Sequence, residues 1–149
     1  MSRAGEARPL ELAVAALARR DYSAEELRAQ LERRGVAADE AAEAVERLAA
    51  AGYVDDVRYA AARAETLAAR GYGNAAIERE LERHGVGREH VDSAISGLEP
   101  EAVRAERALA ELGRGPRSVR RLLAKGFEID AVEAAGGDMW SHGDAHGHP

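Results

Sequence analysis

Residues 23–36 read Ser-Ala-Glu-Glu-Leu-Arg-Ala-Gln-Leu-Glu-Arg-Arg-Gly-Val, and this stretch decides the fold that the sequence predicts. Ser23 and Glu26 have the spacing of a capping box, in which a hydroxyl and a carboxylate satisfy free backbone amides at a helix start. Leu27 and Leu31 would share one face of that helix, and Gly35 can adopt the left-handed conformation that ends it. The stretch therefore predicts a short amphipathic helix with a defined beginning and end.

The same design returns twice along the chain. The three copies are Leu27-x3-Leu31-x3-Gly35-Val36, Ile77-x3-Leu81-x3-Gly85-Val86 and Leu122-x3-Gly126-Phe127, offset by 50 and then 41 residues. The third copy departs from the pattern, because Ser118 stands where the first two have Leu27 and Ile77. Self-similar helical segments of this length predict tandem units, each burying its apolar face with the help of its neighbours.

Helix signals on either side of these copies predict about nine helices. Pro9 is expected in the first turn of a helix that runs to about Arg20, and Asp39 and Asn74 are expected to cap later helices. The prediction is an all-α chain of tandem three-helix repeats stacked as an elongated, curved array. Its modules are expected at residues 9–52, 53–99 and 100–135, with a disordered, histidine-containing tail at 136–149. The alternative is a single irregular bundle of nine helices.

Composition supports an all-helical, intracellular protein. The chain is rich in Ala, Glu, Arg and Leu, and aromatic residues make up only 4% of it, which favours helix over sheet. It contains no cysteine, which excludes disulfides and thiolate metal sites and suits a reducing compartment. The apolar run at residues 9–17 is too short for a membrane span and lacks the flanks of a signal peptide. The expected location is the cytoplasm.

A basic segment interrupts an otherwise acidic chain. The formal net charge is -6, which argues against a protein that coats nucleic acid with its whole surface. Residues 104–125 nevertheless carry a local net charge of +5. On a helix beginning near Pro116, the side chains at 117, 121 and 125 would form a cationic stripe flanked by those at 114 and 120. The candidate contact residues for phosphate or for an acidic protein surface are Arg114, Arg117, Arg120, Arg121 and Lys125. The alternative is a solvated helix face.

The adjacent carboxylates Asp55 and Asp56 are interpreted as the start of a helix, where a carboxylate accepts amide hydrogen bonds and opposes the helix dipole. A metal or acid–base pair is the alternative. Neighbouring residues on a helix point about 100° apart, which suits one ion poorly, and no companion ligands are evident. The sequence also lacks a nucleophile–base arrangement and a Walker-type loop, so no enzyme activity is predicted.

The stretch around this pair resembles a known family. Gly52-Tyr53-Val54-Asp55-Asp56-x-x-Tyr59-Ala60 is similar to the signature between the first two repeats of the RecX regulatory proteins, and the Ser23-x-x-Glu26-Leu27 element resembles their opening. The resemblance covers roughly residues 10–135. Its signature residues here are Gly52, Tyr53, Asp55, Asp56 and Tyr59.

The resemblance implies a function as well as a fold. It implies an array of three-helix modules that binds the RecA recombinase and modulates its nucleoprotein filament in recombination and repair, with inhibition as the expected direction. Contact with DNA is implied as weak or indirect. A monomer without a cofactor is expected. The alternative from another class is a helix-turn-helix transcriptional regulator that reads duplex DNA, although the basic segment occurs once and is not repeated.

Other polar and aromatic residues receive structural interpretations. Arg79, Arg83 and His84 lie near one helix end, and Arg33 and Arg34 lie near the corresponding end of the first unit. Compensation of the helix dipole is expected for them, with a shared binding edge as the alternative. Three tyrosines are expected to pack between modules and not to stack on bases: Tyr53, Tyr59 and Tyr72. No metal site is assigned to the tail histidines, which are His142, His146 and His148.

Overall fold

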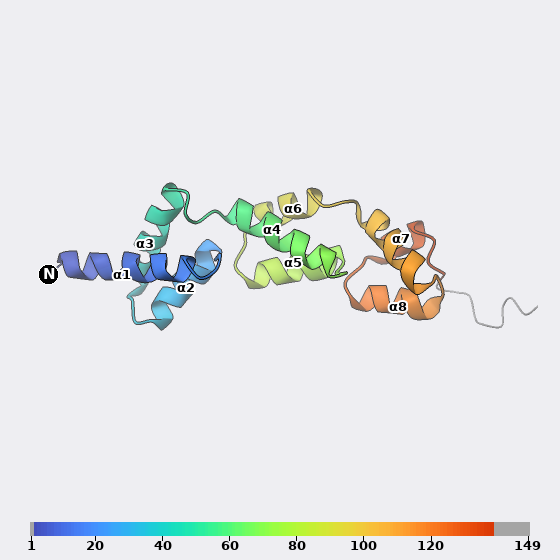
Figure 1. The fold of residues 1–149 in the computed structure, drawn as a ribbon, viewed down its shortest axis with the longest axis horizontal. Helices are drawn as coiled ribbons and strands as arrows, with labels where there is room; N and C mark the ends of the chain where they lie inside the picture. The colour runs from blue at the N-terminus through green and yellow to red at the C-terminus, as the bar shows by residue number, and fades with distance from the viewer. Residues whose placement is uncertain (1, 139–149) are drawn as a thin grey trace, which may run out of the picture.

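The computed structural model describes residues 2–138 of the 149-residue chain, and this part contains nine α-helices and no strand (Figure 1). The predicted all-α class is therefore confirmed. The helices are α1 (Ser2–Leu17), α2 (Ala24–Arg33), α3 (Ala38–Ala50), α4 (Asp56–Ala69), α5 (Asn74–Arg83), α6 (Arg88–Ser96), α7 (Glu101–Leu112), α8 (Pro116–Ala124) and α9 (Ile129–Ala134).

The helices pack as three units, α1–α3, α4–α6 and α7–α9, which follow one another along the long axis of the molecule (Figure 1). Each unit has a core of its own, built mainly from Ala, Leu and Val. The fully buried side chains include Leu27 and Leu31 in the first core, Ile77 and Leu81 in the second, and Leu109 in the third. The predicted elongated array of tandem repeats is confirmed.

The second helix of each unit begins and ends largely as the repeat predicts. Ser23 Oγ accepts from the Glu26 amide at 3.1 Å, and the Ser23 amide donates to Glu26 Oε1 at 3.2 Å, so the capping box is complete. Gly35 ends the turn after α2 with a φ of 93°. In the third unit, Ser118 is buried where the other units have an aliphatic residue, and its hydroxyl donates to the Leu112 carbonyl at 3.1 Å. That hydrogen bond satisfies the Ser118 hydroxyl, which is polar at a position where the repeat has an apolar side chain.

Three helix starts differ from the sequence prediction. Pro9 lies inside α1, which begins at Ser2, because the Ala-, Glu- and Arg-containing segment ahead of it is also helical. Ala37, and not Asp39, is the N-cap of α3, and the Asp39 carboxylate accepts from the Glu40 amide within the first turn. Gly73 is the N-cap of α5, which frees the Asn74 side chain for a contact with another unit.

The predicted boundaries also shift at two places. Val54, expected in the second module, is buried in the first core. Gly136, Gly137 and Asp138, expected in the tail, close α9: the Gly137 amide donates to the Val132 carbonyl at 2.9 Å and the Asp138 amide to the Arg114 carbonyl at 2.9 Å. The rest of the predicted disordered tail, with its three histidines, lies outside the described residues.

Candidate functional site

The first and second units meet where the start of α2 contacts the start of α4 and the end of α5, and we call this contact the first joint. Ser23 Oγ donates to the His84 carbonyl at 2.5 Å, and the Ala24 amide donates to Asp56 Oδ1 at 2.8 Å. Asp56 thus caps a helix of the preceding unit, while Asp55 is the N-cap of its own helix, accepting from the Arg58 amide at 3.1 Å. The two neighbouring carboxylates have separate structural roles.

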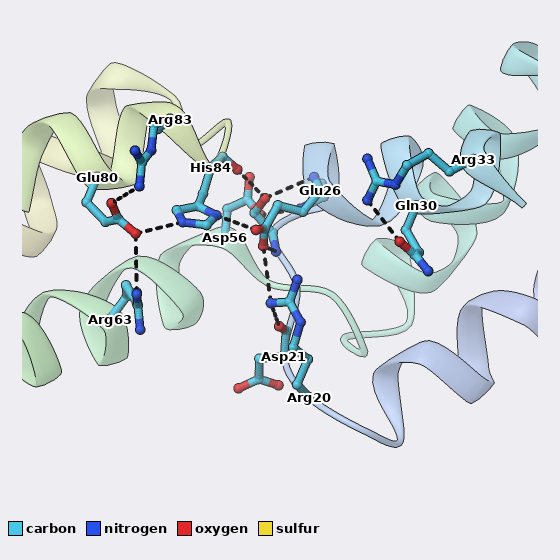
Figure 2. Close-up of polar contacts among 12 residues, drawn as sticks. Arg20, Asp21, Glu26, Gln30, Arg33, Asp56, Arg63, Glu80, Arg83 and His84 are labelled. Carbon is cyan, nitrogen blue, oxygen red and sulfur yellow. Dashed lines mark hydrogen bonds and ion pairs between the residues drawn. The ribbon is translucent and has the colours of Figure 1, made fainter.

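His84 lies at the centre of the first joint and faces two carboxylates (Figure 2). Its Nδ1 contacts Glu26 Oε2 across the joint, and its Nε2 lies 2.8 Å from Glu80 Oε2. Glu80 also holds Arg63 at 3.3 Å and Arg83 at 2.6 Å. Arg83 and His84 were expected to compensate a helix dipole, and here both belong to a network that reaches the first unit.

The environment shifts the pKa of each acid in this network. Burial acts to raise the pKa of Glu26. Hydrogen bonds from His84, the Ser23 amide and Tyr59 outweigh burial and hold that pKa below its usual value. Burial also acts to raise the pKa of Glu80, but hydrogen bonds from His84 and Arg63 stabilise the Glu80 anion and keep its pKa below the usual value. Tyr59 is only 7% exposed, and burial together with the Glu26 charge raises its pKa to about 12. The carboxylates are therefore kept charged, and the Tyr59 hydroxyl is kept protonated.

The second and third units meet at the corresponding positions, and we call this contact the second joint. The Gly73 amide donates to the Lys125 carbonyl at 2.9 Å, and the Ala75 amide donates to the Gly126 carbonyl at 3.0 Å. Glu101, the first residue of α7, accepts from the Asn74 amide at 2.7 Å. Glu101 thereby repeats the role of Asp56, the first residue of α4.

A buried arginine reinforces the second joint and was not among the candidates from the sequence. Arg104 is 7% exposed and donates to the carbonyls of Glu99 and Tyr72, each at 3.1 Å. Its remaining guanidinium nitrogen donates to Asn74 Oδ1. Burial lowers the pKa of Arg104, and the nearby Glu101 and Glu99 oppose that shift. Its position in an amphipathic helix gave no signal, because two of its hydrogen bonds are made to residues of the preceding unit, Tyr72 and Asn74.

The remaining signature residues around the first joint have different surroundings. Gly52 has a φ of 88°, in the left-handed region that favours glycine. Tyr59 is buried, as the packing interpretation required, but Tyr53 is 66% exposed. Tyr53 was therefore wrongly expected to pack between modules, since it lies in the turn that leaves α3.

The predicted cationic stripe is divided. Arg114 is paired with Glu106 at 2.6 Å and donates to the Ala135 carbonyl at 2.9 Å, which ties the start of α8 to its own unit. Lys125 belongs to the second joint, where Nζ donates to the Arg70 carbonyl at 3.1 Å and lies 4.3 Å from the centre of the Tyr72 ring. The other three stripe residues are exposed and have no hydrogen-bond or ion-pair partner among residues 2–138. We call them the α8 arginines: Arg117, Arg120 and Arg121.

A second basic surface lies between α4 and α5, and the sequence did not predict it. A cavity of about 400 Å³ is lined by Arg63, Leu67, Arg70, Tyr72, Ala76, Arg79, Glu80 and Arg83, and we call it the basic groove. Arg70 and Arg79 have exposed side chains without an ion-pair partner within the described part of the chain. Lys125, at the end of α8, contacts two residues that line the groove, Arg70 and Tyr72.

The described residues bring together no group of three or more histidine and acidic side chains placed to hold a metal ion. Between residues 2 and 138, no helix has both the length and the apolar character needed to cross a membrane.

Comparison with known proteins identifies the class as regulatory proteins built from tandem three-helix domains. Residues 10–48 match the family model for the first three-helix domain of RecX, and residues 55–95 match that for the second. The chain is 33% identical over 137 residues to the regulatory protein RecX of Xanthomonas axonopodis pv. citri, covering 85% of both chains. It is 36% identical over 146 residues to that of Chromohalobacter salexigens, covering 92% of this chain and 96% of the relative. The chain belongs to the RecX family.

Solved structures agree on the fold. The crystal structure of RecX from Lactobacillus salivarius superimposes with a TM-score of 0.79 at 16% identity, covering 92% of this chain and 97% of that one. A second RecX crystal structure gives a TM-score of 0.76 at 19% identity, covering 90% of this chain and 72% of that one. The comparisons give no support to the alternative of a transcriptional regulator that reads duplex DNA.

Proposed function

We propose that this protein binds RecA and modulates the assembly and activity of RecA filaments in recombination and DNA repair, with inhibition as the expected direction. We further propose that it acts without catalysis or a cofactor, as a cytoplasmic monomer. The observation that carries the proposal is membership of the RecX family across both of its matched domains. An elongated array supports it, because such an array offers a long face to a polymeric partner.

The α8 arginines and the unpartnered arginines of the basic groove are the proposed contact surface. A guanidinium without an intramolecular partner can pair with carboxylates or phosphates without first giving up an ion pair. Arg114 and Lys125, which were candidates from the sequence, are engaged within the molecule and are assigned a structural role. Any contact with the DNA of the filament would use the same unpartnered cations.

The test is a RecA filament assay on single-stranded DNA that follows ATP hydrolysis and strand exchange as the protein is added. We expect both activities to fall. Inhibition at substoichiometric amounts would support binding at filament ends, and inhibition only near saturation would support binding along the groove. A purified chain that leaves both activities unchanged at every ratio would overturn the proposal.

A matched pair of triple variants tests the contact surface. Arg117→Ala, Arg120→Ala and Arg121→Ala together should weaken binding to the filament and flatten its salt dependence, because fewer charges are neutralised on association. The control removes three exposed arginines from the first unit: Arg19→Ala, Arg34→Ala and Arg47→Ala. Equal losses in the two triple variants would show that net charge, and not the α8 surface, controls binding.

A further inference from the structure

Both ring nitrogens of His84 face carboxylate oxygens, one on each side of the first joint (Figure 2). A neutral imidazole has only one N–H, and its other nitrogen is an acceptor with nothing to accept from a carboxylate. Only the doubly protonated imidazolium donates to Glu26 and Glu80 together. The side chains of His84 and Glu26 are 27% and 14% exposed, so water screens their attraction only in part.

Charged and titratable groups surround His84 from every element packed at the first joint. Glu80 shares its charge with Arg63 and Arg83, and Glu26 has Arg20 at 3.7 Å as a more distant cation. The Tyr59 ring lies 6.5 Å from the imidazole, and Asp56 is occupied by the Ala24 amide. Glu80 therefore keeps two arginines when His84 loses its charge, whereas Glu26 loses the one charged group that links it to the second unit.

The contacts of the second joint use no group that ordinarily gains or loses a proton near neutral pH. His84 and Lys125 are the C-caps of α5 and α8, so they occupy the same position in successive units. A lysine remains charged across the range in which histidine ordinarily titrates. The amide-to-carbonyl bonds of the second joint, from Gly73 and Ala75, have no titratable partner at all.

We propose that the first joint is a proton-dependent latch, which the His84 imidazolium holds closed between Glu26 and Glu80 and which loosens when that imidazole becomes neutral. The bond to Glu26 is then either lost or reduced to one from a neutral donor, which is roughly half as strong. The bonds of Ser23 and Ala24 across the joint remain, so the units stay attached while their relative orientation becomes less restricted. The latch is a property of the chain alone and holds whether or not the chain binds RecA.

The direction with pH follows from the charges. A histidine that gains carboxylate partners stabilises the closed joint at low pH, and that contribution disappears as pH rises through the range in which the imidazole loses its proton. The lowered pKa of Glu26 and of Glu80 has the opposite sign: their contribution is present above the ordinary carboxyl range and is lost only in more acidic solution. The latch is therefore closed while His84 carries its second proton and loosens once that proton is lost.

Distances between spin labels can test the latch, because the chain has no native cysteine. One label pair spans the first joint, Glu43→Cys with Glu89→Cys, and a second pair spans the second joint, Glu89→Cys with Glu133→Cys. All three positions are exposed. Between about pH 5.5 and about pH 8.5 we expect the distance distribution of the first pair to broaden, with the open population rising on the order of tenfold. The distribution of the second pair should not change.

Variants assign the effect to one residue. His84→Lys copies the second joint and should keep the first-joint distribution narrow at both pH values, and His84→Gln should make it broad at both. His90→Gln removes another histidine of the same unit, one with no ion pair among the described residues, and should leave the pH response intact. A first-joint distribution that does not respond to pH in the unaltered chain would overturn the latch. A pH response that persists in His84→Lys would also overturn it, and that comparison stands even if His84→Gln fails to fold.

Discussion

The two joints of this protein occupy the same places in the repeat but are made of different chemistry. The first depends on side chains: the Ser23 hydroxyl, the Asp56 carboxylate and the His84 imidazole. The second likewise has an acidic residue at a helix start, Glu101, and adds the buried Arg104 guanidinium. It differs in its backbone amide-to-carbonyl bonds, which form because Gly73 and Gly126 have no side chain. A repeat can thus keep the place where its units meet while the contacts made there differ from one joint to the next.

The largest expected effect comes from a side chain placed in the backbone contact of the second joint. A Cβ on Gly126 would lie 2.5 Å from the Ala76 Cβ and 2.6 Å from the Ala76 amide nitrogen, and its φ of 96° disfavours any side chain. We expect Gly126→Ala to lower the free energy of unfolding by about 3 kcal/mol, combining backbone strain with overpacking. Urea denaturation followed by circular dichroism measures the loss.

Gly35→Ala is the matched control for that substitution. Gly35 ends the second helix of the first unit with a similar φ of 93°, but a Cβ there would meet nothing within 4 Å. We expect a loss of about 1 kcal/mol, from backbone strain alone. Equal losses at Gly35 and Gly126 would mean that the second joint contributes nothing through its close approach.

Arg104→Leu should have the next largest effect, about 2 kcal/mol, because it leaves the Tyr72 carbonyl and Asn74 Oδ1 without their buried donor. Arg107→Leu is the control, since its pairing with Glu99 is exposed to solvent and should contribute much less to stability. Thermal unfolding compares the two variants. A loss as large for Arg107→Leu would indicate that burial of Arg104 is not what makes it important.

The first joint should be weaker when tested in the same way. Ser23→Ala removes one half of the capping box and the hydrogen bond to the His84 carbonyl, and we expect it to cost about 1 kcal/mol. Hydrogen exchange should then rise at the start of α2 and at the end of α5, and not in the third unit. Protection unchanged at the end of α5 would show that the Ser23 hydroxyl does not hold the two units together.

The smallest effect at neutral pH is expected for Tyr59→Phe, below about 1 kcal/mol. In alkaline solution the ionisation of the Tyr59 hydroxyl is expected to affect stability. Because the folded state raises the pKa of Tyr59 to about 12, its contribution to stability is complete below the ordinary tyrosine range and is lost as pH rises through that value. An ultraviolet titration of the chain, which has four tyrosines, should show one late ionisation that Tyr59→Phe removes.

Much of the fold could be predicted because each helix has local signals. The capping box at Ser23, the Leu27 and Leu31 face and the stop at Gly35 each depend on residues within one turn or two. Local signals gave the wrong N-cap where more than one nearby residue could occupy that position. Asp39 and Asn74 are good capping residues, yet the N-caps of those helices are Ala37 and Gly73, one or two residues earlier.

The joints could not be predicted, because the residues that meet at each joint are far apart in sequence and belong to different units. Glu26 and His84 are separated by 58 residues, and Arg70 and Lys125 by 55. The contacts of one stripe residue were hidden for the same reason: the helical spacing places Lys125 beside Arg121, but only the neighbouring unit shows that Lys125 contacts Arg70 and Tyr72. The α8 arginines remain a prediction that filament binding must test.

Pro116 gives the second helix of the third unit a different start. It is the first residue of α8, as Ala24 is of α2 and Asn74 of α5, and those two residues each donate their amide to an acidic residue of the unit that follows. A proline has no amide hydrogen to donate there. The first residue of α8 therefore cannot make the amide-to-carboxylate contact that the first residues of α2 and α5 make.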